Sequence, residues 1–126
     1  MSHTFSLRMV EAAAAVPPRS SAAARGVAKC LKAYRTVYNE QKAKGMQPAT
    51  AHHAGDVAYR LAMPTMENLD SIRVYIACVA QGMNLQVFSG REVSQMLYAA
   101  QVALTMVKIA GKEAQDDKEA VYIHAS

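Results

Sequence analysis

Apolar residues recur at steps of three and four over four stretches of the chain, the spacing that places side chains on one face of a helix. The first stretch covers about residues 21–44. Its polar side carries three bases, Arg25, Lys29 and Lys32. Its apolar face is made of Val27, Leu31, Tyr34 and Tyr38, with Cys30 and Val37 at the edge. The pattern therefore predicts an amphipathic first helix with a cationic outer side.

The ends of the first two helices are marked by capping residues and prolines. Ser20 or Ser21 can cap the first helix at its N-terminus, and Gly45 can close it. Pro48 suits the first turn of a second helix. Pro64 disfavours helical geometry at the residue before it, so the second helix is expected to end there.

The third and fourth helices have comparable signals. Asp70 can cap the third helix, and Gly82 is expected to stop it. Ser89 and Glu92 have the spacing of a capping box at the start of the fourth helix, and Gly111 is expected to close it. The four predicted helices cover about residues 21–44, 48–62, 71–81 and 90–110.

The third stretch, IRVYIACVAQGM at residues 72–83, is apolar on all sides except at Arg73 and Gln81. A helix of this kind is normally buried, so we expect it at the centre of the fold. There, aspartate in place of Ile76 or Val79 should unfold the domain. The run is little more than half of the roughly 20 residues that a membrane span needs, and we expect no membrane contact.

These elements predict an all-α fold, a single compact bundle of four main helices around the hydrophobic third helix, over residues 20–111. Residues 1–19 are expected to form an N-terminal arm, and residues 112–126 a flexible C-terminal tail. The sequence leaves open whether AVYIH, residues 120–124, is a short strand or an ordered part of that tail. A brief extended segment is expected over residues 85–88.

The composition is that of one packed domain. Of 126 residues, 52% are hydrophobic and 19% are charged, a balance typical of a globular protein and not of a disordered one. The two cysteines, Cys30 and Cys78, have no CxxC partner, and we expect packed thiols in place of a disulfide. No charged leader followed by a long apolar run opens the chain, so we expect no signal peptide and a cytoplasmic protein.

The segment HHAGDVAYR, residues 52–60, is the strongest candidate for chemistry. On a helix, His52 and Asp56 lie one turn apart, whereas His53 points about 100° away, so the two histidines cannot share one metal ion. A transition-metal site usually takes three or four ligands. We therefore expect both histidines and Asp56 to be solvated, with no metal, no cofactor and no catalytic residue. Cys30, near the basic face, is only a weak candidate for a reactive thiol.

Positive charge is concentrated in one part of the chain. Residues 19–44 hold seven bases against one acid, Glu40, an excess larger than the net charge of +4 on the whole chain. Tyrosines and arginines stand close together at several positions, and the centres of interfaces favour both. The residues that we expect to bind a partner are Arg25, Lys29, Lys32, Arg35, Tyr59, Arg60 and Arg73. The expected partner is a protein or nucleoprotein. The sequence leaves open whether the basic face binds nucleic acid and whether the chain forms a homo-oligomer.

Three segments, AYRLAMP (58–64), IRVYIACVAQGM (72–83) and LYAAQVAL (97–104), resemble parts of a set of small helical proteins from bacterial mobile elements and phage-like regions. The resemblance covers roughly residues 27–108. It implies a context in which short proteins inhibit host defence systems, CRISPR–Cas among them, or regulate transcription.

Three functions follow as hypotheses. The first is a non-enzymatic interaction protein, an inhibitor of anti-CRISPR type that occupies a surface on a host defence nucleoprotein. The second is a small nucleic-acid-binding or transcription-regulatory protein that uses the same basic face. The third is an enzyme with an unrecognised site, for which His52, Asp56 and Cys30 are the only leads. We expect that the protein is not an enzyme.

Overall fold

The protein is all-α, as predicted. A computed structural model describes the backbone of residues 21–125 and the side chains as far as residue 116, and within that part of the chain there is no strand. The four helices described are α2 (Ala22–Ala43), α3 (Pro48–Ala62), α4 (Leu69–Asn84) and α5 (Gly90–Ala125). The expected N-terminal arm, residues 1–19, lies outside the described residues.

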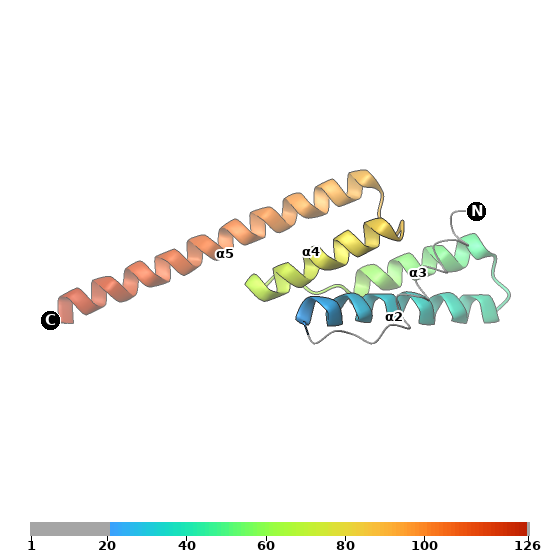
Figure 1. The fold of residues 1–126 in the computed structure, drawn as a ribbon, viewed down its shortest axis with the longest axis horizontal. Helices are drawn as coiled ribbons and strands as arrows, with labels where there is room; N and C mark the ends of the chain where they lie inside the picture. Colours follow the sequence, from blue (N-terminus) through green and yellow to red (C-terminus); the bar gives the residue numbers. More distant parts are fainter. Residues whose placement is uncertain (1–20, 126) are drawn as a thin grey trace.

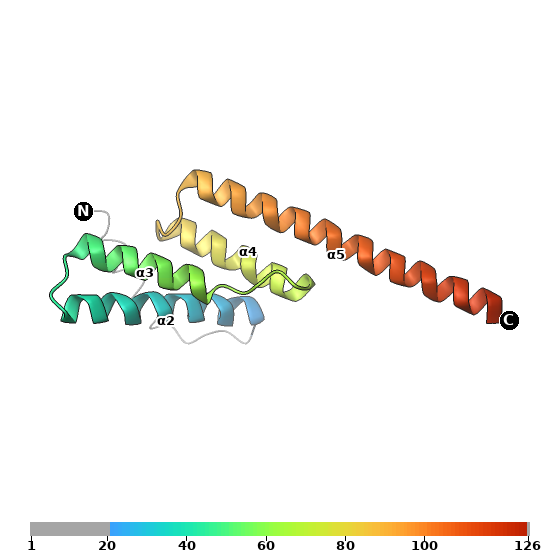
Figure 2. The ribbon, with the colours of Figure 1, turned by 180° about the vertical axis from the view of Figure 1, so that it is seen from behind.

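The helices form a three-helix core with one long helix attached to it. α2 packs against both α3 and α4, and α4 packs against α5. Figures 1 and 2 show α4 between α2 and the first part of α5, while the C-terminal part of α5 extends beyond the other helices. The third predicted helix, α4, therefore lies centrally, since it contacts α2 on one side and α5 on the other.

The predicted ends of α2 and α3 are confirmed. Ser21 caps α2, its hydroxyl oxygen accepting a hydrogen bond from the backbone N–H of Ala24 at 3.2 Å. Beyond α2, Gly45 adopts φ of +80°, a left-handed conformation that glycine reaches without a steric penalty. Pro48 occupies the first turn of α3, and Met63, which precedes a proline, has the extended ψ of 147°.

The start of α4 differs from the prediction. Asn68, and not Asp70, is the N-cap: its side-chain oxygen accepts a hydrogen bond from the Ser71 N–H at 2.8 Å, and the Ser71 hydroxyl accepts one from the Asn68 N–H at 2.9 Å. Such a reciprocal pair satisfies two backbone donors at once, so it defines the helix start more strongly than Asp70 alone. Asp70 lies in the first turn instead.

Gly82 and Gly111 do not stop their helices, which corrects both predictions. α4 continues to Asn84, and a side chain at Gly82 would collide with the ring of Phe88, so this glycine serves close packing. α5 continues through Gly111 as far as Ala125. Among the described residues Gly45 is the glycine with positive φ. A glycine in helical geometry destabilises an exposed helix by only about 1 kcal/mol relative to alanine, so a helix can continue through it.

The predicted boundary between the bundle and a tail at residue 111 is absent from the backbone. Residues 112–125 belong to α5, so the stretch 120–124 is helical and is not a strand. Residues 85–88 are likewise not extended but form a turn, in which the Val87 N–H donates to the Gly82 carbonyl at 2.8 Å. That turn reverses the chain so that α5 can pack on α4.

The core lies where α2, α3 and α4 meet. Gly55 of α3 faces the ring of Tyr34 so closely that an added Cβ would lie 2.9 Å from ring atoms, and this allows α2 and α3 to approach. Val79 is fully buried, as predicted, but Ile76 is 37% exposed, so the expectation that Ile76 is a buried core residue is wrong. The buried cluster comprises Cys30, Leu31, Tyr34, Tyr38, Ala51, Tyr59, Cys78, Val79, Leu85, Val87, Phe88 and Val93.

One helix within the described residues is long and apolar enough to cross a membrane by length and composition. This helix is α5, over Gly90–Asp116, and only 11% of its most apolar stretch is buried. The sequence prediction had considered the third helix for this role and not the fourth.

Candidate functional site

The bases in the first part of α2 lie along one side of the helix. Arg25, Lys29 and Lys32 are exposed and Arg35 is partly exposed, and these four residues are called the α2 basic surface below. They lie on the outer side of the helix because its inner side is buried against α3 and α4. The buried residues of α2 are Cys30, Leu31, Tyr34 and Tyr38.

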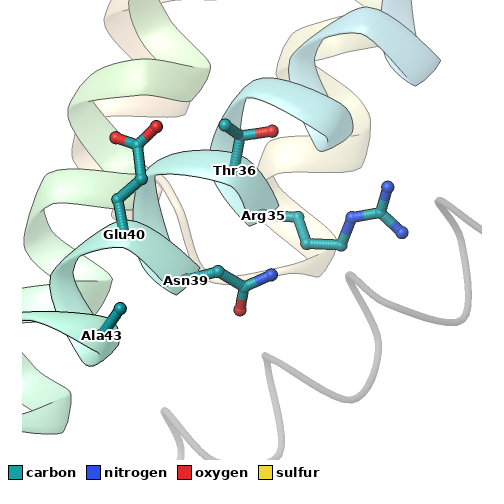
Figure 3. Close-up of a pocket in the computed structure, with 5 residues that line it drawn as sticks. All are labelled: Arg35, Thr36, Asn39, Glu40 and Ala43. Carbon is teal, nitrogen blue, oxygen red and sulfur yellow. The ribbon is translucent and has the colours of Figure 1, made fainter.

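A shallow hollow runs along the side of α2 next to Arg35. All five described residues that line it belong to this one helix: Arg35, Thr36, Asn39, Glu40 and Ala43. In Figure 3 the guanidinium of Arg35 and the carboxylate of Glu40 point away from each other. These groups do not converge on a common point, so the hollow extends the α2 basic surface and does not form a separate catalytic cleft.

Tyr59, predicted to bind a partner, is instead a core residue. Its side chain is fully buried, and its hydroxyl donates a hydrogen bond to the backbone carbonyl of Cys78 at 2.6 Å. Its ring meets the ring of Phe88 edge-on at 5.8 Å between centroids. Burial raises the pKa of Tyr59 above its usual value. The prediction that Tyr59 presents a ring to a partner is wrong, because the ring is enclosed in the core between Gly82 and Phe88.

Arg60, the next residue, joins three parts of the fold. Its guanidinium forms an ion pair with Glu92 of α5 and donates a hydrogen bond to the Val87 carbonyl at 3.1 Å. The guanidinium carbon also lies 4.9 Å from the centroid of the Phe88 ring, within the range of a cation–π contact. Arg60 therefore holds α3 to the α4–α5 turn, although 41% of its side chain remains exposed.

Glu92 is the acidic partner in this arrangement and also belongs to the predicted capping box. Its carboxylate accepts a hydrogen bond from the Ser89 N–H at 3.2 Å, and the Glu92 N–H donates to the Ser89 hydroxyl at 3.1 Å. Hydrogen bonding from Arg60, followed by that from Ser89, lowers the pKa of Glu92 to about 2. The capping box is thus confirmed, and it has an additional function in positioning the ion pair.

A pocket of about 310 Å³ lies beside this ion pair, between the end of α3, α4 and the start of α5. It combines charged, phenolic and amide groups with an apolar wall, which suits binding of a side chain better than catalysis. Its lining residues are Arg60, Met63, Pro64, Tyr75, Glu92, Gln95 and Met96. Sequence reasoning missed this pocket, because its walls come from three helices whose packing the sequence does not specify. Arg73 is exposed on α4 and does not line it.

His52 is buried, which corrects the prediction that both histidines are solvated. Only 1% of its surface is exposed, its Nδ1 atom forms a hydrogen bond with the Tyr34 hydroxyl, and its ring lies 4.7 Å from that of Tyr38. His53 is exposed, as expected. A signal was present in the sequence: His52, Gly55 and Tyr59 share the helical spacing of one face, which is the face that α3 buries.

Asp56 is partly buried and was also predicted to be solvated. Burial raises its pKa to about 6, while the nearby charges of Arg60 and His53 oppose that rise. The carboxyl lies on α3 near Tyr34, whose own pKa is raised by burial and by Asp56. Among the described residues, no group of three or more histidine, cysteine and acidic side chains is placed to hold a metal ion.

The two cysteines are packed thiols, as predicted. Cys30 of α2 and Cys78 of α4 are both fully buried, and their sulfur atoms lie 3.7 Å apart. The hydrogen bond with Cys78 and burial raise the pKa of Cys30 far above its usual value. A thiol in such surroundings is a poor nucleophile, which argues against Cys30 as a reactive thiol.

The structure does not bring all the predicted partner-binding residues together. The α2 basic surface lies on one helix, Arg60 lies at the junction with α5, and α2 and α5 do not pack against each other within the described residues.

No protein-family model matches the chain, and neither a curated protein nor a solved structure shows detectable similarity to it.

Proposed function

We propose that the protein is a non-enzymatic interaction protein whose α2 basic surface occupies an acidic or nucleic-acid-loaded surface on a larger partner. The observation that carries the proposal is the exposure of Arg25, Lys29 and Lys32 opposite a fully buried face. Packing of the core does not require charge at these positions. A cationic surface of this kind speeds association with acidic partners.

The placement of the titratable groups supports binding over catalysis. His52 and Cys30 are buried in the core, where a substrate would have to displace tightly packed side chains to reach them. Asp56 is partly buried on α3. Catalytic sites combine such groups with an accessible cleft, and the hollow on α2 has no second wall among the described residues.

The narrower form of the proposal is an inhibitor of a host defence nucleoprotein, of the anti-CRISPR type, acting in the cytoplasm. It rests on the resemblance to small proteins of mobile elements and phage-like regions. A surface already loaded with nucleic acid presents anionic phosphates, and the α2 basic surface on a 126-residue chain is suited to contact them.

A second candidate function is direct binding of nucleic acid. Arg25, Lys29 and Lys32 follow one another at helical spacing along about 10 Å of α2, so several phosphates of one strand lie within their reach. Such binding would depend steeply on salt and little on sequence, because the surface offers charge and no arrangement that reads bases.

Capture from a bacterial lysate tests the main proposal. The wild-type chain is compared with the triple variant Arg25→Glu, Lys29→Glu, Lys32→Glu, and with a control that reverses Lys44 and Lys108, two exposed bases outside the α2 basic surface. We expect a defined protein or nucleoprotein with the wild type and the control but not with the triple variant. Capture that survives in the triple variant contradicts the proposal.

Nuclease treatment before capture separates the two candidate functions. If the partner is a protein or a nucleoprotein surface, it stays bound after free nucleic acid has been digested. If only nucleic acid is retained, and its affinity falls steeply between low and moderate salt, then phosphate binding is the function.

A further inference from the structure

α5 carries a second exposed stripe on the side opposite the one that packs against α4. The packed side includes Val93 and Ala100, which are buried. The outer stripe follows steps of four and three: Arg91, Gln95, Tyr98, Val102, Thr105, Ile109, Lys112 and Asp116, all of which are exposed. This is the spacing by which two helices pack along a seam. Its centre is apolar, its N-terminal end carries the base Arg91, and its C-terminal end carries the base Lys112 and the acid Asp116.

We propose that this stripe binds a second copy of the same chain, forming an antiparallel pair of α5 helices. The stripe is self-complementary only in that direction. With one helix reversed, Tyr98 faces Ile109 of the partner subunit, and Val102 faces Thr105 of the partner subunit. In the same register Arg91 faces Asp116 of the partner subunit. The apolar centre is then covered, each end pairs a base with an acid, and Lys112 faces the uncharged Gln95 of the partner subunit.

A parallel pair would place each charged residue of the stripe against its own copy. Arg91, Lys112 and Asp116 would each face a like charge, which opposes association. The antiparallel register is thus selected by charge, while the apolar residues supply the driving force.

The shape of the molecule allows this pair. The three-helix core lies on the packed side of α5, so it does not obstruct the outer stripe (Figures 1 and 2). The projecting C-terminal half of one α5 would lie along the core-bearing half of the other. The segment from Arg91 to Asp116 is about 38 Å long. Tyr98 and Met106, which are 70% and 61% exposed, supply large apolar area toward the roughly 1,000 Å² that a stable interface buries.

The middle of the stripe has a form suited to interdigitation. A hollow of about 260 Å³ lies beside Val102 and Thr105, with Tyr98 and Met106 at its edges. The Thr105 hydroxyl donates to the Gln101 carbonyl at 3.0 Å, so its hydrogen-bonding need is met within the helix. The threonine methyl is then available to pack against an apolar side chain of the partner subunit.

A lipid bilayer would use the same stripe less well. Gln95, Gln101 and Lys108 interrupt the apolar stretch of α5, and polar groups of this kind are costly within the hydrocarbon region. The packed side of the helix is moreover covered by α4. The inference concerns α5 alone and does not depend on the function proposed for α2, although a dimer would carry two α2 basic surfaces.

Cysteine cross-linking of the full chain tests the register. Two variants are made, Tyr98→Cys and Ile109→Cys, and each is oxidised alone and after mixing. We expect a cross-linked dimer in the mixture and little in either variant alone, because two copies of position 98 lie about 16 Å apart in the antiparallel register. Cross-linking of each variant with itself would indicate a parallel pair and overturn the proposal.

Sedimentation tests the association itself. The wild type should dimerise with rising concentration, and Val102→Glu should weaken the dimer at least tenfold. Met46→Glu is the matched control, because Met46 is 44% exposed and Val102 45% exposed, while Met46 lies outside α5. A wild type that stays monomeric to near-millimolar concentration contradicts the proposal. Binding of that monomer to phosphatidylcholine–phosphatidylglycerol vesicles would assign the stripe to lipid instead.

Discussion

The hydroxyl of Tyr59 on α3 donates a hydrogen bond of 2.6 Å to the backbone carbonyl of Cys78 on α4, and the tyrosine side chain is fully buried. The bond links two helices that the sequence places in succession but does not orient. It gives the phenol a partner in a region where a buried polar group without one would be costly. Tyr59 thereby links α3 to α4 through its side chain.

Replacing Tyr59 with phenylalanine should lower the free energy of unfolding by about 1–2 kcal/mol, because the ring still fills its space but the hydrogen bond is lost. Urea denaturation monitored by circular dichroism measures the change. Tyr98→Phe is the control, since Tyr98 is 70% exposed and should change the monomer by less than about 0.5 kcal/mol. Equal effects of the two substitutions would contradict the role given to Tyr59.

Replacing Arg60 with methionine should destabilise the fold by about 1–3 kcal/mol. The loss comes from the hydrogen bond to Val87 and the contact with Phe88 more than from the ion pair with Glu92, because exposed ion pairs contribute little. Arg73→Met provides the comparison, as Arg73 is an exposed arginine on α4. If the two variants unfold at the same denaturant concentration, Arg60 does not hold α3 to the α4–α5 turn.

Asp56 should make the protein less stable as pH rises from about 4 to 6. Burial raises its pKa from 3.8 to about 6, so in this window the folded state binds more protons than the unfolded state. Stability is then highest below the unfolded pKa and falls as the pH passes through the folded pKa. Asp56→Asn should remove that fall and should stabilise the protein at pH 7 by roughly 1–3 kcal/mol. Denaturation midpoints measured from pH 4 to 7 test the prediction, with Asp70→Asn, an exposed aspartate, as the control.

Two substitutions on α4 separate its buried face from its exposed one. Val79→Asp places a charge where the side chain is fully buried and should cost about 4 kcal/mol or more, enough to unfold a small domain. Ile76→Asp should leave the chain folded, because Ile76 is 37% exposed and the carboxylate can reach water. Circular dichroism of both variants distinguishes the outcomes. A folded Val79→Asp protein would be inconsistent with the position of α4 in the core.

The sequence specifies the helices and the polarity of α2 because both depend on local spacing. Ser21 and Gly45 limit α2 through contacts within a few residues, and the opposite faces of that helix differ in charge over its whole length. The exposed position of Lys29 and the buried position of Leu31 follow from that difference. Local rules therefore suffice for the α2 basic surface.

The position of a single residue in the core depends on packing, which local spacing describes only in part. Because histidine is polar, the sequence predicts that His52 is solvated. His52 nevertheless shares the buried face of α3 with Tyr59, and its ring packs against Tyr34 and Tyr38. Gly111 has the composition of a helix end, but helix-favouring neighbours on both sides let α5 continue. The pocket at Arg60 is lined by residues of three helices, so the spacing of residues along any one of them does not predict it.

A titration of the captured partner with the purified protein tests the central claim most directly. The partner's activity is measured against increasing amounts of the wild type, of the triple variant at Arg25, Lys29 and Lys32, and of the Lys44 and Lys108 control. We expect inhibition that saturates at a fixed molar ratio with the wild type and the control. The triple variant should not inhibit, although its helical content should be unchanged. Inactivation of many partner molecules by one molecule of the protein, or full inhibition by the triple variant, would contradict binding through the α2 basic surface.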